Sequence, residues 1–158
     1  MKVICNTTPL IALSSIGEID LLEKVYSTVM VPKAVVDEIM VGGKIHVPKL
    51  AHLAWIEVVP NITSFEDRLL YQLDYGERQV VLNALKLKAD LTLIDDRVAR
   101  NIAEYFGLTV KGTLGLLVDA KRKSLISSFK KKAIKMKNQG IYFSDKLIEA
   151  IASSLGEH

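Results

Sequence analysis

The chain is poor in the residues that build disulfide-bonded or zinc-stabilised folds. Its 158 residues include one cysteine, Cys5, and three scattered histidines, His46, His52 and His158. A lone thiol excludes an intramolecular disulfide, and the absence of Cys/His pairs at zinc spacing excludes a structural zinc site. The fold must therefore depend on a hydrophobic core, which a chain of this length can build unaided. This cysteine usage is typical of a reducing cytoplasm.

The sequence also lacks a membrane span and a disordered tract. Its apolar beginning, residues 1–16, is interrupted by Asn6-Thr7-Thr8-Pro9, and no apolar run approaches the roughly 18 residues that cross a bilayer. No segment combines low hydrophobicity with high charge, and we find neither an internal repeat nor a linker. We therefore expect one ordered domain over residues 1–158 and no association with a membrane.

Charge is distributed unevenly along the chain. The net charge is only +3, yet eight basic residues and no acid lie between Lys121 and Lys137, which leaves 13 basic and 18 acidic residues elsewhere. Lys130, Lys131 and Lys132 are consecutive within this stretch. Such a run forms either a solvated surface or a contact surface for RNA phosphates, and the sequence leaves both interpretations open.

Hydrophobic periodicity predicts strands that alternate with helices. Apolar runs without polar alternation predict strands at residues 2–5, 28–31, 55–59, 91–94 and 109–110. Helical spacing predicts helices after Pro9, over 33–40, over 65–88 with a break near Gly76, and over 98–106, 114–120, 129–137 and 145–154. This order predicts an α/β fold with a parallel sheet covered on both faces, followed by a C-terminal helical segment from about residue 113.

Polar residues at the ends of the predicted strands are the first candidates for chemistry, because parallel α/β sheets bind ligands beyond the carboxyl ends of their strands. Asn6 follows the first strand, and Asp95 and Asp96 follow the strand at 91–94. Glu38 and Glu77 add two carboxylates at helical positions. Such oxygen ligands suit Mg²⁺ or Mn²⁺, which can activate water and neutralise the charge of a phosphodiester. The acidic residues therefore predict a phosphodiesterase site.

Each of these residues also has an ordinary structural explanation. Asp95 or Asp96 suits the N-cap of the next helix, and Glu77 suits a first helical turn. Glu38 suits a solvated helix face, and Asn6 suits the turn after the first strand. Spacing alone does not decide between these explanations and metal binding.

A series of motifs makes the chain similar to a known family. The motifs are Cys5-Asn6-Thr7-Thr8-Pro9-Leu10-Ile11-Ala12-Leu13, Val31-Pro32-Lys33-Ala34-Val35-Val36-Asp37-Glu38-Ile39, Gly76-Glu77-Arg78, Leu93-Ile94-Asp95-Asp96-Arg97-Val98-Ala99-Arg100, Gly112-Thr113-Leu114-Gly115 and Ile141-Tyr142-Phe143-Ser144-Asp145. In this order and spacing they resemble PIN-domain proteins, in particular the branch called DUF3368. The resemblance spans nearly the whole chain.

The resemblance implies a three-layer α/β/α sandwich with a central parallel sheet and a ribonuclease site that uses Mg²⁺ or Mn²⁺. It implies Glu38, Glu77, Asp95 and Asp96 as catalytic acids, and Asn6, Glu38, Glu77 and Asp96 as metal ligands, with Asp95 as the alternative to Asp96. Asn6 stands where the family usually has its first Asp, so the site carries one charge less and should hold Mg²⁺ more weakly. Similar proteins are toxins of toxin–antitoxin pairs, so an antitoxin partner and a homodimer are also implied.

Arg97 and Arg100, one helical turn apart beside the acids, either contact RNA phosphates or pair with nearby carboxylates. Three functions remain open at this stage. The chain is a metal-dependent ribonuclease, a PIN-like protein that binds nucleic acid or partners without cutting, or a phosphoacceptor signalling domain. The last architecture requires an acidic pair after the first strand, where this chain has Asn6, so we rank it last.

Overall fold

A five-stranded parallel sheet forms the middle of the computed structural model, which describes residues 1–158. The strands are β1 (Val3–Cys5), β2 (Val29–Pro32), β3 (Ile56–Val59), β4 (Leu91–Leu93) and β5 (Val110–Lys111). Their order is β3-β2-β1-β4-β5, and every pair is parallel. The chain thus runs outward from β1 to β3, returns to β4 on the other side of β1, and continues to β5. The boundary between β1 and β4 is the topological switch point of the sheet.

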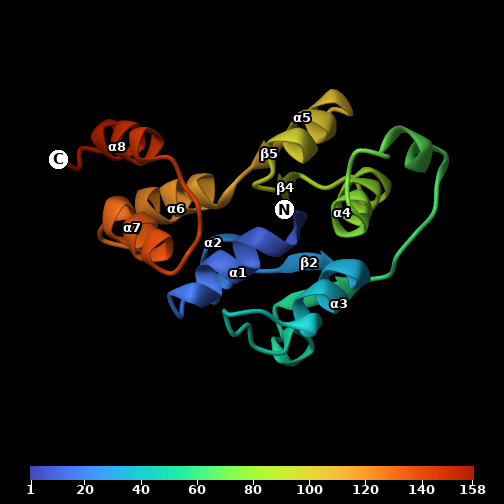
Figure 1. The fold of residues 1–158 in the computed structure, drawn as a ribbon, viewed down its shortest axis with the longest axis horizontal. Helices are drawn as coiled ribbons and strands as arrows, with labels where there is room; N and C mark the ends of the chain where they lie inside the picture. The colour runs from blue at the N-terminus through green and yellow to red at the C-terminus, as the bar shows by residue number, and fades with distance from the viewer.

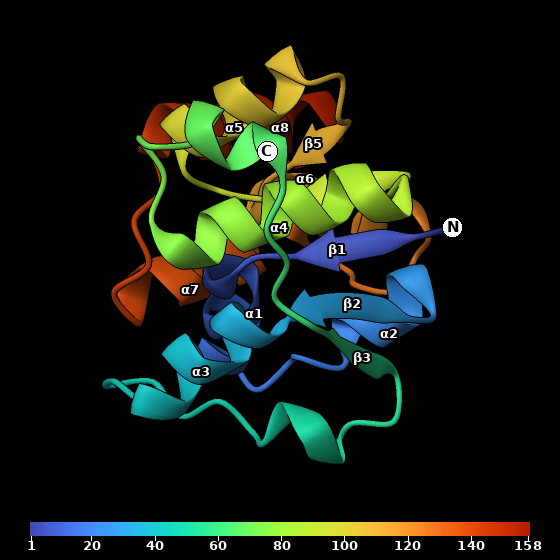
Figure 2. The same ribbon diagram turned by 90° about the vertical axis from the view of Figure 1, so that its right-hand side faces the viewer.

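Helices cover both faces of this sheet. They are α1 (Thr7–Ser15), α2 (Leu21–Tyr26), α3 (Lys33–Val41), α4 (Tyr75–Leu87), α5 (Arg97–Tyr105), α6 (Thr113–Arg122), α7 (Phe129–Asn138) and α8 (Asp145–Ser154), with short 3-10 helices η1 (Leu50–His52) and η2 (Phe65–Leu69). Helix α4 lies on one face, and α1, α6 and α7 lie on the other (Figures 1 and 2). The predicted α/β/α sandwich with a central parallel sheet is confirmed.

The central strands are buried, which explains their lack of polar alternation. Every residue of β1 and of β4 is buried, including Thr92. A strand that is covered by helices on both faces has no solvent side, so its side chains are apolar at successive positions. The edge strand β3 differs, because Glu57 and Val58 are exposed there.

Two predicted helical regions differ in detail from the structure. The region predicted as two consecutive helices from residue 65 contains only the five-residue 3-10 helix η2 before α4 begins at Tyr75. Leu70 and Leu73, in the irregular segment between them, are buried in the core, so tertiary packing there overrides the helical pattern. Helix α1 begins at Thr7, before Pro9, because a proline in the first turn lacks only an N–H that has no partner inside the helix.

Several helices are capped by residues that are distant in sequence. The Ala34 N–H at the start of α3 donates to Asn61 Oδ1 (2.9 Å). At the start of α7, the Phe129 N–H donates to Glu157 Oε2 (2.8 Å) and the Lys130 N–H donates to Glu157 Oε1 (3.0 Å). These contacts connect the last residues of the chain to the helical layer that begins at Thr113. None of the helices has the length and apolar character that a membrane crossing requires.

Candidate functional site

The ends of β1 and β4 bring the predicted site residues to one edge of the sheet. The Asn6 N–H donates to Leu93 O (2.9 Å), so Asn6 continues the pairing of β1 with β4 by one residue. Asp95 and Asp96 follow within three residues of Leu93. Because the chain leaves these two strands in opposite directions, the switch point opens between them, as in other parallel α/β sheets.

Asn6 occupies the N-cap position of α1, but it does not act as a cap. Its side chain accepts no hydrogen bond from the helix, although the residue is only 6% exposed. The neighbouring Thr7 Oγ1 is also buried and has no hydrogen-bond partner. Buried polar groups normally have partners, because leaving them unpaired costs free energy. The structure therefore does not support the turn-holding explanation of Asn6 and leaves its amide oxygen free to bind a ligand.

Glu77 forms a reciprocal capping box with Asp74 at the start of α4. The Glu77 N–H donates to Asp74 Oδ1 (2.8 Å), and the Asp74 N–H donates to Glu77 Oε1 (3.0 Å). Burial, and then the negative charges of Asp74 and Asp96, raise the pKa of Glu77 to about 7, although the hydrogen bond from the Asp74 N–H opposes this. Glu77 is thus a structural residue that also lies beside two other carboxylates.

Asp74 is a member of this group that the sequence analysis missed. The signal was present, because an Asp three residues before a Glu at a helix start is the pattern of a capping box. Asp74 fixes where α4 begins, and through its hydrogen bonds it fixes the position of Glu77.

Glu38 reaches the same region from α3. A Cβ atom at residue 76 would lie 3.1 Å from Glu38 Oε1 and 3.6 Å from Asp74 Oδ1, so Gly76 permits the close approach of this carboxylate to the first turn of α4. Glu38 and Thr7 also line a hollow of about 460 Å³. Glu38 therefore lies between the end of β1 and the start of α4.

The structure separates the roles of Asp95 and Asp96. Asp96 is exposed, caps α5 by accepting the Ala99 N–H at 2.9 Å, and is close enough to Glu77 to affect its pKa. Asp95 instead accepts the Thr113 N–H (2.8 Å) at Oδ1 and the Thr113 hydroxyl (2.6 Å) at Oδ2. Asp95 thus caps α6 from a distance, since Gly112 at the N-cap position has no side chain.

Burial raises the pKa of Asp95, and the hydrogen bonds from Thr113 and the positive charge of Arg100 only partly offset this. A Cβ atom at residue 112 would lie 2.7 Å from Asp95 Oδ1, a separation that real Cβ atoms do not reach. Glycine at this position is therefore required for the contact between Asp95 and α6. The N-cap explanation is correct for Asp96, which caps the next helix, whereas Asp95 binds the start of α6 instead; only Asp96 also lies among the other acids.

The donor chemistry of this acidic group fits a hard divalent cation. None of Glu38, Glu77 and Asp96 has a basic partner within 4.0 Å. Carboxylate and amide oxygens without counter-charges are the ligands that Mg²⁺ and Mn²⁺ prefer. No three Asp, Glu, His or Cys side chains converge tightly enough to form a ready metal-binding group, so these oxygens are neighbours rather than a preformed cage.

The predicted lysine surface is partly neutralised. Lys130 Nζ lies 2.8 Å from Glu149 Oε1, and Lys132 Nζ lies 2.8 Å from Glu18 Oε2, whereas Lys131 has no carboxylate partner. Ion pairing reduces the charge that these lysines offer to a phosphate. Their contact with RNA stays a prediction.

Arg97 and Arg100 differ from Lys130 and Lys132 in that they form no ion pair. Neither guanidinium has a carboxylate within 4.0 Å, so the ion pairs that were one of the two interpretations are not present, although the charge of Arg100 acts on Asp95. Arg100 lies over the backbone of Gly112, because a Cβ atom there would be 3.1 Å from Arg100 Nη1. Both arginines remain free to contact an anion.

Together these features define a parallel α/β/α protein whose switch point is lined by acidic side chains. A family model for the PIN domain called DUF3368 matches residues 2–157, and the chain belongs to this family. PIN domains commonly have nuclease activity and generally use divalent metal ions. Searches of curated proteins and of solved structures found no match to the chain.

Proposed function

We propose that this PIN domain is a metal-dependent ribonuclease that hydrolyses phosphodiester bonds of RNA with Mg²⁺ or Mn²⁺. The observation that carries the proposal is the group of oxygen side chains at the switch point, which lack basic partners. Asn6, Glu38, Glu77 and Asp96 supply these oxygens from β1, α3, α4 and the end of β4. They come from four separate segments to one edge of the sheet, where Glu77 and Asp96 also cap helices.

In this proposal, Asn6, Glu38, Glu77 and Asp96 would hold the cation. When bound, it supplies an activated water and neutralises charge that develops on the phosphodiester. The other residues act on these ligands. Asp74 orients Glu77 through their two hydrogen bonds, and Thr113 holds Asp95, which fixes the turn that presents Asp96.

The test is cleavage of mixed-sequence RNA oligonucleotides by the purified chain, with Mn²⁺ and with chelator. We expect cleavage in Mn²⁺ only, and a loss of at least about 100-fold in Asp96→Asn, because changes in outer-shell residues alone cost about 10- to 100-fold. Asparagine is as good an N-cap as aspartate, so this variant keeps the start of α5.

Glu104→Gln is the matched control, because Glu104 is an exposed acid on the same helix, away from the switch point. It should cleave like the native chain. Asp95→Asn is measured beside it to separate the two aspartates. Cleavage that resists chelator, or that survives in both aspartate variants, comes from a contaminant and overturns the proposal.

A second candidate function is binding of nucleic acid without cleavage. Two observations favour it: the neutral Asn6 at the end of β1, and the lack of a tight group of three acidic side chains. The same assay distinguishes it, since a non-cutting protein binds RNA but gives no Mn²⁺-dependent product. The phosphoacceptor alternative has no support, because the acidic pair follows β4 rather than β1.

We extend the first proposal to a cytoplasmic toxin that acts as a homodimer and is inhibited by an antitoxin protein. Its support is the resemblance to toxin-type PIN proteins. Expression of the chain should arrest growth, and co-expression of a protein from an adjacent gene should relieve the arrest. Arrest that persists in Asp96→Asn would show that it does not depend on the acidic site.

A further inference from the structure

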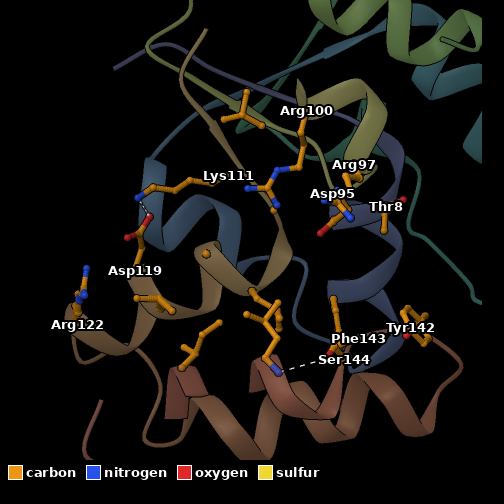
Figure 3. A pocket seen from close by; sticks show the side chains of 17 residues that line it. Thr8, Asp95, Arg97, Arg100, Lys111, Asp119, Arg122, Tyr142, Phe143 and Ser144 are labelled. Atoms are coloured by element: carbon orange, nitrogen blue, oxygen red, sulfur yellow. Dashed lines mark hydrogen bonds and ion pairs between the residues drawn. The ribbon is translucent and has the colours of Figure 1, made fainter. Parts of the chain in front are cut away.

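A wide hollow lies beside the acidic group, on the other side of Asp95. It has a volume of about 670 Å³ and is bounded by α5, β5, α6 and α8 (Figure 3). This is the size of pocket that accommodates a small organic molecule or a short stretch of polymer. Its lining includes Arg97, Arg100, Arg122 and Tyr142, of which the sequence analysis selected only the first two for binding.

The acids in this arginine pocket already have partners. Asp95 is held by two hydrogen bonds from Thr113. Asp119 pairs with Lys111 Nζ at 2.7 Å and accepts a hydrogen bond from the Tyr26 hydroxyl at 3.2 Å. The carboxylates that line the pocket thus have hydrogen-bond or ion-pair partners within the protein, and neither forms an ion pair with an arginine of the pocket.

Three guanidinium groups of the pocket form no ion pair, although the charge of Arg100 acts on the nearby Asp95 carboxylate. Arg97, Arg100 and Arg122 have no carboxylate within 4.0 Å. They reach the pocket from α5 and from the end of α6, and in Figure 3 Arg97 and Arg122 lie towards opposite ends of the hollow. The planar donor fork of arginine matches phosphate geometry, which makes an uncompensated set of arginines a phosphate-binding feature.

Tyr142 adds a surface for a base. It lines the same hollow, and its side chain is 89% exposed although it is large and aromatic. Aromatic side chains beside a basic groove stack bases of single-stranded nucleic acid with little sequence preference. An arginine set with one exposed tyrosine is therefore more consistent with a single strand than with free phosphate.

The pocket and the acidic group are lined by residues that are neighbours in the sequence. Asp95 lines the pocket, whereas the next residue, Asp96, lies among the acids. Thr8 lines the pocket as well, two residues after Asn6. At most one residue of the chain therefore separates the lining of the pocket from the acidic group.

We propose that the arginine pocket is a subsite for single-stranded RNA, in which Arg97, Arg100 and Arg122 bind backbone phosphates and Tyr142 stacks a base next to the cleaved bond. This proposal rests on the ribonuclease function for its role, but the binding itself does not depend on cleavage. It assigns Arg122 and Tyr142 to RNA binding.

The experiment measures fluorescence anisotropy of a short single-stranded RNA at several salt concentrations, with chelator present so that no metal-dependent cleavage occurs. We expect Arg97→Gln and Arg122→Gln each to weaken binding about 3- to 10-fold and to lower the slope of log Kd against log salt by about 0.7, the value for one phosphate contact. Tyr142→Leu should weaken binding about fivefold or more with an unchanged slope.

Lys86→Gln removes one charge from an exposed lysine on α4, outside the pocket, and Tyr105→Leu removes an exposed tyrosine from α5. These controls should change affinity by less than about twofold. If the arginine variants bind RNA as tightly as Lys86→Gln, the subsite does not exist, whether or not the native chain cleaves. If native binding depends on the arginines but no metal-dependent cleavage occurs, the subsite stands and the ribonuclease proposal fails.

Discussion

The two sides of the Asp95–Asp96 turn differ in the sign of the charge that the protein leaves uncompensated. On one side Glu38, Glu77 and Asp96 form no ion pair, and on the other side Arg97, Arg100 and Arg122 form none, although the charge of Arg100 acts on Asp95. The two groups are connected by adjacent residues, yet they do not neutralise each other. Asp95 lines the arginine pocket and the next residue, Asp96, lies beside Glu77, because successive side chains of the turn have different neighbours.

Water stabilises unpaired charge on exposed side chains, but like charges that lie close together or are partly buried disfavour the ionised state. Repulsion among Asp74, Glu77 and Asp96 helps to raise the pKa of Glu77, which is the expected result of gathering carboxylates without a counter-ion. A cation on the acidic side and phosphates on the arginine side would relieve both groups at once. The comparison therefore predicts that variants on the two sides have separable effects.

The largest expected effect is on the acidic side. Glu38→Gln should lower Mn²⁺-dependent RNA cleavage at least about 100-fold, because it removes a charged ligand while keeping the size of the side chain. RNA binding in chelator should stay within about twofold of native, since Glu38 does not line the arginine pocket. Glu57→Gln, at an exposed position of β3, is the control. Normal cleavage by Glu38→Gln would show that Glu38 is not needed for catalysis, and the proposed difference between the two sides would then fail for α3.

The next effect is on stability, at the boundary between the two sides. Thr113→Val removes the hydroxyl that donates to Asp95 Oδ2 and leaves a carboxylate oxygen without its partner. We expect a loss of about 1–3 kcal/mol in the free energy of unfolding, measured by urea titration. The exposed Thr109→Val is the control. An unchanged free energy of unfolding would mean that the hydrogen bond from Thr113 does not stabilise the fold. Asp95 would then again be a candidate metal ligand.

A smaller effect is expected when the acidic side gains the charge that it lacks. Asn6→Asp should bind Mn²⁺ about tenfold more tightly, because the ligand set gains one negative charge at the end of β1. Calorimetry measures the two affinities, and Asn101→Asp, an exposed position on α5, controls for net charge. Equal affinities in the native and Asn6→Asp chains would remove Asn6 from the proposed ligands.

The smallest effect concerns the lysine-rich stretch, whose charges, unlike those of the arginine pocket, are partly compensated. Burial alone would raise the pKa of Glu157, but hydrogen bonds from the N–H groups of Lys130 and Phe129, with those from Ser128 and Lys121, lower it to about 2. Glu157→Ala should therefore cost about 1 kcal/mol of unfolding free energy at neutral pH, the usual value of a helix cap.

The direction of the pKa shift of Glu157 determines how its contribution to stability depends on pH. Because folding lowers the pKa of Glu157, its contribution is complete above its ordinary pKa of about 4.5 and is lost as the pH falls towards about 2. The difference in unfolding free energy between native and Glu157→Ala should shrink over this range. A difference that stays constant with pH would show that the carboxylate charge does not stabilise the start of α7.

Much of the fold could be predicted from the sequence. The apolar runs that became β1 and β4 lack polar alternation because both faces of the sheet are covered, and that signal is local. The region from residue 65 to 74 was less predictable, since Leu70 and Leu73 are buried by packing in an irregular segment rather than by helical periodicity. Asp74 was missed, although its spacing to Glu77 is a local pattern.

The site was predictable in position but not in its division of roles. Asn6 and Asp96 follow strand ends and Glu77 lies at a helix start, which the sequence shows, whereas Glu38 lies inside α3. The partners of Asp95 and of the lysines could not be predicted, because Thr113 lies 18 residues from Asp95 and Glu18 lies 114 residues from Lys132. Such pairs form only when distant segments meet in the folded chain.

By itself, the sequence determined the alternation of strands and helices, the family, and the residues that end β1 and β4, because hydrophobic period and short motifs are properties of neighbouring positions. Only the tertiary structure decided which charges are compensated. In the folded chain Asp95 caps α6, and Lys130 and Lys132 form ion pairs with glutamates. Asp96 and the arginines of the pocket form no ion pair. The physical reason is that an ion pair or a distant cap depends on distance in space, which the order of residues does not contain.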